Sequence, residues 1–169
     1  TRPARIRHRC SNGSRCTVVA ADAVDPAASQ GAIDAGLAAY GRIDVALLNA
    51  GGGKPTDMAQ ASSAEVLSVM RRNFDTLVNF FCPMIQHMQG VGGTIGYTGS
   101  PAGFFGLPKS GPYSAAKAAG RVLFDTCRIE LSGSGIRLVA LYPGFTETPG
   151  LNPDDVPVKA LIIQPDRAV

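Results

Sequence analysis

The sequence predicts an α/β fold in which strands and helices alternate around a parallel sheet. Short apolar or β-branched runs predict the strands, and helical spacing or capping signals mark the segments between them. The predicted strands cover 17–20, 43–48, 93–97 and 136–142, and the predicted helices cover 26–40, 63–88 and 113–131. This alternation is typical of βαβ units, which build doubly wound sheets with helices on both faces. A chain of 169 residues with no linker fits one domain.

Local signals support each element. Pro26 suits a helical first turn, and Ser62 with Glu65 forms a capping-box pattern before the long second helix. Ser132-Gly133 is a usual signal for the end of a helix. The strand over 43–48 runs directly into Asn49-Ala50-Gly51, which indicates a buried strand that feeds a tight loop.

Composition excludes several classes of protein. Apolar residues make up 45% and charged residues 17% of the chain, which is a globular balance. No window of eighteen apolar residues predicts a membrane span, and no secretory signal is present, so a cytoplasmic location is expected. The four cysteines lack metal-ligand spacing and are expected to be reduced thiols; the two histidines lack ligand partners, so no metal site is predicted. These residues are Cys10, Cys16, Cys82, Cys127, His8 and His87.

The first sixteen residues are strongly basic. Five arginines precede Asp22, the first acidic residue, whereas the rest of the chain has 11 basic and 13 acidic residues, a balance of −2. A basic segment can contact nucleic acid, a membrane surface or a phosphate group. Because no aromatic residue in it can stack on a base, we expect a solvated, irregular segment and no nucleic-acid partner.

Polar residues gather at one predicted edge of the sheet. Tyr113 and Lys117 lie four apart on a predicted helix and therefore share one face. A nearby ammonium group favours the ionised form of a phenol, which suits acid–base chemistry. Ser100 follows the strand over 93–97, and Pro143-Gly144 follows the last strand. Ligands of α/β sheets bind at the carboxyl ends of the strands, so the sequence predicts a ligand crevice there.

Six motifs in order resemble the short-chain dehydrogenase/reductase family. They are Asn49-Ala50-Gly51, Asn73, Ser100, Tyr113-Ser-Ala-Ala-Lys117, Pro143-Gly144 and Thr146. The resemblance implies a partial Rossmann-like domain that binds NAD or NADP and acts on a small alcohol or carbonyl compound. It also implies dimers or tetramers built through the helices that contain Asn73 and Tyr113.

The resemblance assigns a role to each matched residue. Tyr113 would be the general acid or base, Lys117 would hold the nicotinamide ribose and support Tyr113, and Ser100 would donate a hydrogen bond to the substrate oxygen. Asn73 would expose a backbone carbonyl to a water that relays protons. The cofactor contacts would be Asp22 at the adenine, Asn49, Ala50 and Gly51 at the adenosine, and Pro143, Gly144 and Thr146 at the nicotinamide, together with Tyr113 and Lys117.

The sequence departs from the family pattern at both ends. The Gly-rich turn that opens the family and takes the cofactor pyrophosphate does not occur, and the last helix and strand of the family are also unmatched. In the family strand order 3-2-1-4-5-6-7, the strand over 43–48 would then have an open edge. Open edges invite association, and we expect a domain of low stability.

Two further interpretations stay open. The chain is either part of an enzyme or a non-enzymatic fragment or binding module that keeps the four catalytic positions without the phosphate site. A sugar-nucleotide epimerase or dehydratase shares the Tyr-x-x-x-Lys spacing, although the Asn49-Ala50-Gly51 motif and the short length argue against it.

Overall fold

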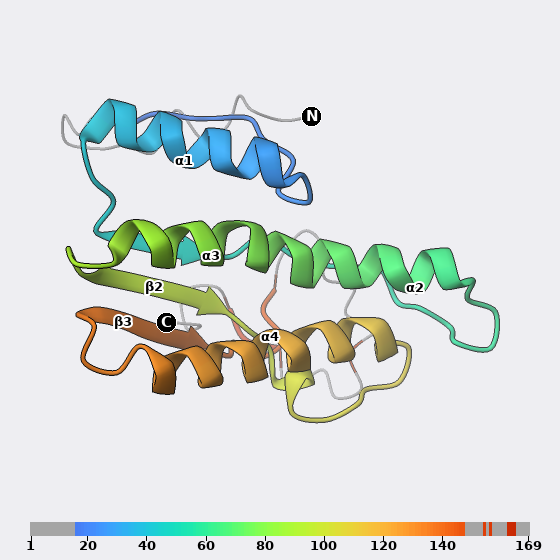
Figure 1. The fold of residues 1–169 in the computed structure, drawn as a ribbon. Coiled ribbons are helices and arrows are strands. Elements are labelled where there is room, and N and C mark those ends of the chain that lie inside the picture. The colour runs from blue at the N-terminus through green and yellow to red at the C-terminus, as the bar shows by residue number, and fades with distance from the viewer. Residues whose placement is uncertain (1–15, 148–153, 155, 157–161, 165–169) are drawn as a thin grey trace.

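A computed structural model describes residues 16–147, 154, 156 and 162–164. Three strands and four α-helices alternate along it, joined by a π-helical turn, η2, and a short 3₁₀ helix, η3 (Figure 1). In chain order the elements are α1 (Pro26–Tyr40), β1 (Val45–Leu48), α2 (Ser63–Met70), η2 (Arg71–Asp75), α3 (Thr76–Met88), β2 (Gly93–Thr98), η3 (Pro101–Gly103), α4 (Gly111–Glu130) and β3 (Ile136–Leu141).

The three strands form one parallel sheet in the order β1-β2-β3. In register, Leu48 lies opposite Tyr97, and Tyr97 lies opposite Ala140. Parallel strands need crossover connections, and here α2 to α3 and then α4 provide them. The predicted α/β class and parallel sheet are confirmed.

The helices that the structure describes cover one face of the sheet. Figure 1 shows α3 and α4 in front of the strands, with α1 beside α3. Side chains from α1, α3 and α4 pack against Ile95 and Leu138, and Met88, Ile95 and Phe124 are fully excluded from solvent. The opposite face carries Val45 and Leu47, which are 68% and 61% exposed. No helix of the described residues covers that face.

Two predicted elements differ from the structure. Residues 17–20 do not form a strand: the described residues offer them no neighbouring strand, and Thr17 instead accepts a hydrogen bond from the Tyr40 hydroxyl through Oγ1 at 3.0 Å. A β-branched run without a ladder partner cannot satisfy strand hydrogen bonds. The predicted helix over 63–88 has the right limits but is interrupted by η2.

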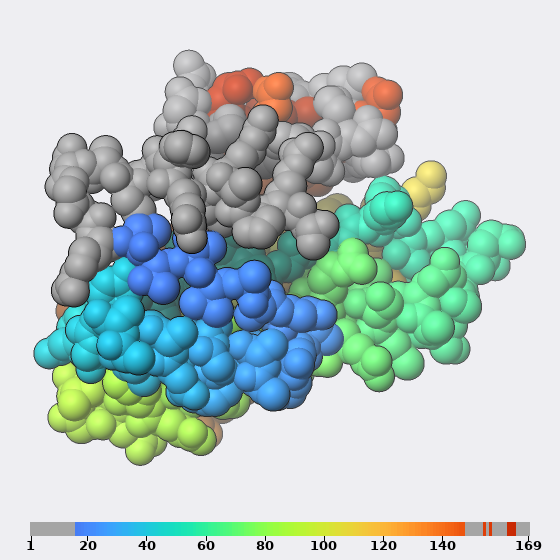
Figure 2. All heavy atoms as spheres, turned by 90° about the horizontal axis from the view of Figure 1, so that it is seen from above, coloured from blue at the N-terminus to red at the C-terminus, as the bar shows by residue number. Residues whose placement is uncertain are grey.

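The end of the sheet at β1 is open, as the sequence predicts, because β2 is its sole strand neighbour in the described part of the chain. Seen from above, α1 and the segment before it form one surface, and α2 extends beyond it (Figure 2). Cys16, Cys82 and Cys127 are free thiols. Cys10, the basic segment over 1–15 and the loop after 147 lie outside the described residues. Among the described residues, no helix is long and apolar enough to cross a bilayer.

Candidate active site

Lys117 is a buried cation at the carboxyl end of the sheet. It lies in the second turn of α4 and is 5% exposed, and its Nζ donates a hydrogen bond to the carbonyl of Thr98, the last residue of β2, at 2.8 Å. Burial lowers the pKa of Lys117 to about 8. The Tyr113 ring lies one turn earlier on the same helix face, with its centroid 5.7 Å from this nitrogen. The predicted convergence of Tyr113 and Lys117 is therefore present in the geometry.

The loop after β1 approaches the same ammonium group. A Cβ placed on Gly51 would lie 2.8 Å from Oδ1 of Asn73 and 3.6 Å from Nζ of Lys117. A side chain at this position would fill the space in front of the ammonium group. Glycine is needed here because the backbone of the loop passes so close to two functional side chains.

Asn73 fixes that loop to the long helix. Its Oδ1 accepts a hydrogen bond from the Gly52 N–H at 2.8 Å, and its Nδ2 donates to the carbonyls of Gly52 and Val69, each at 2.9 Å. Asn73 is 1% exposed and lies at the centre of η2. A single π-helical turn inside an α-helix frequently marks a functional site. The family resemblance identified Asn73, but no local sequence signal predicts the π-turn around it.

Ser100 lies two residues after β2 and begins η3. Its Oγ accepts the Ala102 N–H at 3.2 Å, a contact that leaves the hydroxyl hydrogen available to another acceptor. The η3 turn packs closely on α4: a Cβ on Gly103 would lie 3.0 Å from the backbone of Lys117. The short turn that follows Ser100 thus lies against the part of α4 that contains Lys117.

The predicted adenosine contacts lie along α3 and the end of β1. The Asp22 carboxylate accepts the Val24 N–H at 3.0 Å, and Nδ2 of Asn79, on α3, holds the carbonyls of the next two residues, Ala23 and Val24, each at 3.0 Å. Asn49 and Ala50 directly follow β1 and are exposed. Ala50 accepts a long contact, 3.4 Å, from the Thr76 hydroxyl. The structure gives no direct contact between Asp22 and Lys117.

The predicted nicotinamide contacts follow β3. The Leu141 carbonyl accepts the Gly99 N–H at 2.7 Å, which ties the ends of β2 and β3 together. Pro143 and Gly144 come next, and the hydroxyl of Thr146 donates to the Gly144 carbonyl at 3.2 Å. Thr146 is also held by a parallel bridge to Ile163. These residues stand at the same sheet edge as Ser100.

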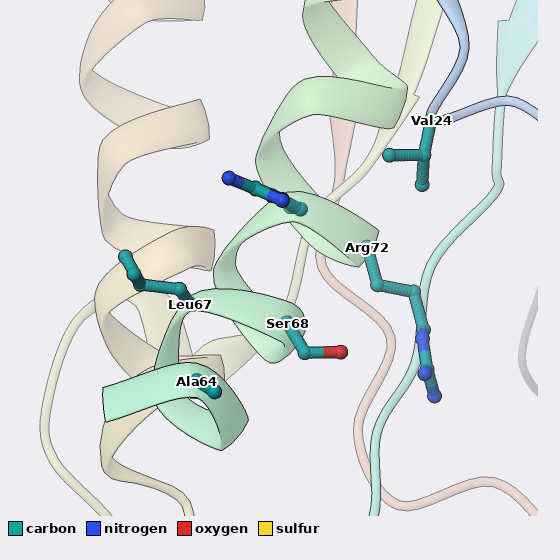
Figure 3. Close-up of a pocket in the computed structure, with 6 residues that line it drawn as sticks. Val24, Ala64, Leu67, Ser68 and Arg72 are labelled. Atoms are coloured by element: carbon teal, nitrogen blue, oxygen red, sulfur yellow. The ribbon is translucent and has the colours of Figure 1, made fainter. Parts of the chain in front are cut away.

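One hollow of the described surface lies away from these residues. It has a volume of about 440 Å³ and is lined by Val24, Ala64, Leu67, Ser68, Arg71 and Arg72. Figure 3 shows Ser68 of α2 and Arg72 of η2 on one side of the long helix, Leu67 on the other, and Val24 on the segment before α1. It is an open surface of α2, without Tyr113 or Lys117 in its lining. The candidate active site is instead defined by the buried polar contacts of Asn73 and Lys117.

Sequence reasoning missed two contributors to the site, Tyr97 and Thr98. Both belong to a short β2 strand that reads as ordinary core, and their contact with Lys117 depends on how α4 crosses the sheet. No local pattern carries that information. Within the described ranges, no group of three or more His, Cys, Asp or Glu side chains is arranged to hold a metal ion.

Comparison with known proteins identifies the family. The family model described as short chain dehydrogenase matches residues 2–155. The chain is 32% identical over 119 residues to the 11-beta-hydroxysteroid dehydrogenase-like 4A protein of Arabidopsis thaliana, covering 70% of this chain and 40% of that protein. It is also 32% identical over 111 residues to the 3-oxoacyl-[acyl-carrier-protein] reductase FabG of Thermotoga maritima, covering 65% of this chain and 45% of the relative.

Solved structures agree in fold. A short-chain type dehydrogenase/reductase from Mycobacterium marinum superposes with a TM-score of 0.78 at 27% identity, over 83% of this chain and 57% of that one. The 3-ketoacyl-(acyl-carrier-protein) reductase of Brucella melitensis, complexed with NADH, gives 0.72 at 27% identity, over 78% and 57%. The chain thus spans about half the length of these relatives. With motifs, fold and family model in agreement, the chain belongs to the short-chain dehydrogenase family.

Proposed function

We propose that this chain carries the catalytic part of an oxidoreductase that transfers hydride between NAD or NADP and an alcohol or carbonyl compound. The curated relatives include a steroid dehydrogenase-like protein and an acyl-carrier-protein reductase. Structural neighbours were solved with NADH and with NADPH bound. These names support a nicotinamide cofactor and a hydroxyl or carbonyl substrate, and they leave both NAD and NADP open.

The observation that carries the proposal is the environment of Lys117. Its buried ammonium group donates one hydrogen bond to the Thr98 carbonyl and lies close to Gly51, Asn73 and Tyr113. Burying a cation is costly, so a protein retains one where its charge or its donors are used. An ammonium group has three N–H donors, and one of them binds Thr98, which leaves two that could donate to the hydroxyls of a ribose.

The other side chains fit complementary roles. Tyr113 would exchange a proton with the substrate oxygen, and Lys117 beside it would favour the phenolate during that exchange. Ser100 would donate its remaining hydrogen to the same oxygen and stabilise developing charge there. Asn73 would fix the loop over 49–53 so that the crevice keeps its shape. The bound cofactor would accept or supply the hydride.

The residues present fit the nicotinamide end of such a cofactor better than its phosphates. Gly51 leaves open space in front of Lys117, and Pro143, Gly144 and Thr146 stand at the same edge as a candidate wall. Asp22, Asn49 and Ala50 are the candidate adenosine contacts. By contrast, no Gly-rich pyrophosphate turn occurs within the 169 residues. The second candidate function is a binding module or inactive chain that keeps the candidate catalytic residues.

Cofactor titration separates the two candidates. We would titrate the purified chain with NADH and NADPH by fluorescence, and compare Lys117→Ala with Lys109→Asn. The control removes an exposed ammonium group at a left-handed position that asparagine tolerates. Micromolar binding that weakens at least tenfold in Lys117→Ala alone supports the oxidoreductase. A folded chain that binds neither cofactor up to millimolar concentration supports the inactive module.

Turnover provides the second arm of the test. With either cofactor and a panel of cyclic and linear ketones, Tyr113→Phe should remove activity, because the phenol hydrogen is the proposed proton source. Tyr40→Phe is the matched control, since Tyr40 is 40% exposed and lies on α1. Unchanged turnover in Tyr113→Phe would contradict the proposed role.

A further inference from the structure

The residue beneath Lys117 is an aromatic one. Tyr97 precedes Thr98 on β2 and is 2% exposed. It aligns with Leu48 and Ala140 and so faces the helices, where its ring centroid lies 5.3 Å from Nζ of Lys117. One strand therefore provides both contacts that hold the ammonium group from below, a carbonyl oxygen from Thr98 and an aromatic ring from Tyr97.

The ring has little freedom to leave this position. It packs against Phe124 of α4 with centroids 5.5 Å apart. Its hydroxyl lies against Gly120, where an added Cβ would be 2.6 Å from the oxygen. Leu77 closes the same space, since one of its methyl carbons would lie 3.0 Å from that Cβ. The gap left by Gly120 admits the phenol, and α4 locks it in place.

The Tyr97 hydroxyl makes no hydrogen bond to any described residue although it is buried. An unpaired buried hydroxyl is unfavourable, so the hydroxyl does not explain why a tyrosine occupies this core position. Burial, together with Tyr113 and Tyr142, raises the pKa of Tyr97 well above its usual range, so the phenol stays neutral. The face of the Tyr97 ring is therefore the part of this side chain that can interact with the Lys117 ammonium group.

We propose that Tyr97 is a positioning residue whose ring face holds the Lys117 ammonium group in its charged form at the end of β2. A cation within about 6 Å of a ring centroid is attracted by the π electrons, and more strongly where water is excluded. The charge is then kept where Gly51 and Asn73 border the crevice. The inference relies on the proposed use of Lys117, but the contact itself can be tested without turnover.

The surroundings of Lys117 make the ring a major favourable influence on its charge. The titratable groups placed around it are the phenols of Tyr97 and Tyr113, and Asn73 approaches from the π-turn as a neutral group. None of these groups is a carboxylate that could pair with the ammonium. Burial disfavours the charge, and the Thr98 carbonyl and the ring oppose that effect.

The test measures the Lys117 pKa by NMR in the whole chain with ¹³C-labelled lysine side chains. Tyr97→Phe keeps the ring and removes the unpaired hydroxyl, so its Lys117 pKa should stay within a few tenths of a unit. Tyr97→Leu keeps an apolar side chain and removes the ring. Its Lys117 pKa should fall by about one further unit, because the charged form loses the cation–π attraction. Equal Lys117 pKa values in the two variants would overturn the proposal.

A second series removes dependence on the folding of Tyr97→Leu. Phenylalanines with one, two and three ring fluorines at this position keep the ring's shape and progressively withdraw its π electrons. The Lys117 pKa should then fall stepwise along the series, and a flat series would overturn the proposal. If the chain turns substrate over, the alkaline limb of its pH profile should move with these values. If it does not, the NMR titration still decides the role of Tyr97 separately from the proposed function.

Discussion

The two faces of the three-stranded sheet differ in what covers them. The face under α3 and α4 is closed and holds Met88, Ile95 and Phe124 at 0% exposure, whereas the opposite face leaves Val45 and Leu47 largely exposed. Both sets of residues are apolar, and on β1 the exposed Val45 and Leu47 alternate with Ala46 and Leu48, which pack against the core. The difference therefore comes from the helices, and the candidate active site forms on the covered side, where the helices place Asn73, Tyr113 and Lys117.

This contrast indicates that the candidate active site is assembled by contacts within the described half of the fold. Every partner of Asn73 and Lys117 named above belongs to β1, β2, α2 to α4 or the loops between them. On the opposite face of the sheet, no described helix covers Val45 and Leu47. A patch of contiguous apolar side chains of this kind is typical of a surface that another structural element covers.

The largest expected difference between the faces is in packing energy. Ile95→Ala should lower the free energy of unfolding by about 2–5 kcal/mol, because it leaves a cavity in the closed layer. Leu47→Ala, on the neighbouring strand and the open face, should change it by less than about 1 kcal/mol. Urea denaturation followed by circular dichroism measures both. A loss at Leu47 as large as the loss at Ile95 would show that the open face is covered in solution.

A second prediction concerns how closely the helices approach the closed face. Gly120→Ala would place a methyl group 2.6 Å from the Tyr97 hydroxyl oxygen, so the ring or α4 must shift, at a cost of about 1–3 kcal/mol. Gly31→Ala is the matched control on α1, where nothing lies within 4 Å of the added carbon. It should stabilise the chain by about 0.5–1 kcal/mol. If the two variants had similar stability, α4 or the Tyr97 ring would have to move to accommodate the added methyl group at little cost in free energy.

The sequence predicts correctly those features that depend on neighbouring residues in the chain. It does not predict features that depend on how separate helices and strands pack together. The Ser62–Glu65 capping box forms as predicted, and the strands β1, β2 and β3 were found because each is a short apolar or β-branched run that ends in Gly, Pro or polar residues. The predicted burial of β1 is wrong, because no described element covers Val45 and Leu47. Residues 17–20 have the same local signal, but without a ladder partner they are not a strand. Strand formation requires a neighbour, and a single run does not reveal one.

The site divides in the same way. The spacing of Tyr113 and Lys117 places them on one helix face, which the sequence reveals directly. The π-turn around Asn73 and the ring of Tyr97 beneath Lys117 depend on how α2 to α4 pack on the strands. Because these packing contacts join residues from separate elements, a short sequence motif does not predict them.

The remaining prediction concerns the ammonium charge that the closed face of the sheet holds. Lys117 has a folded pKa of about 8, below its value in an unfolded chain, so the unfolded state binds more protons between these two values. The stability of the chain should therefore rise with pH from about 8 toward 10.5, by on the order of 2–3 kcal/mol. Lys117→Met removes the buried charge and should be about 1–2 kcal/mol more stable than the parent at pH 7.

The advantage of Lys117→Met should shrink as the pH approaches 10.5, because the parent then folds with a neutral amine. Urea midpoints of both proteins at pH 7, 8.5 and 10 measure this, and titrating groups common to the two chains cancel in the difference. Lys109→Asn, at an exposed lysine, should show no such trend. A constant difference in stability across this pH range would mean that the Lys117 ammonium group is solvated. Water would then reach the candidate active site on the covered face of the sheet.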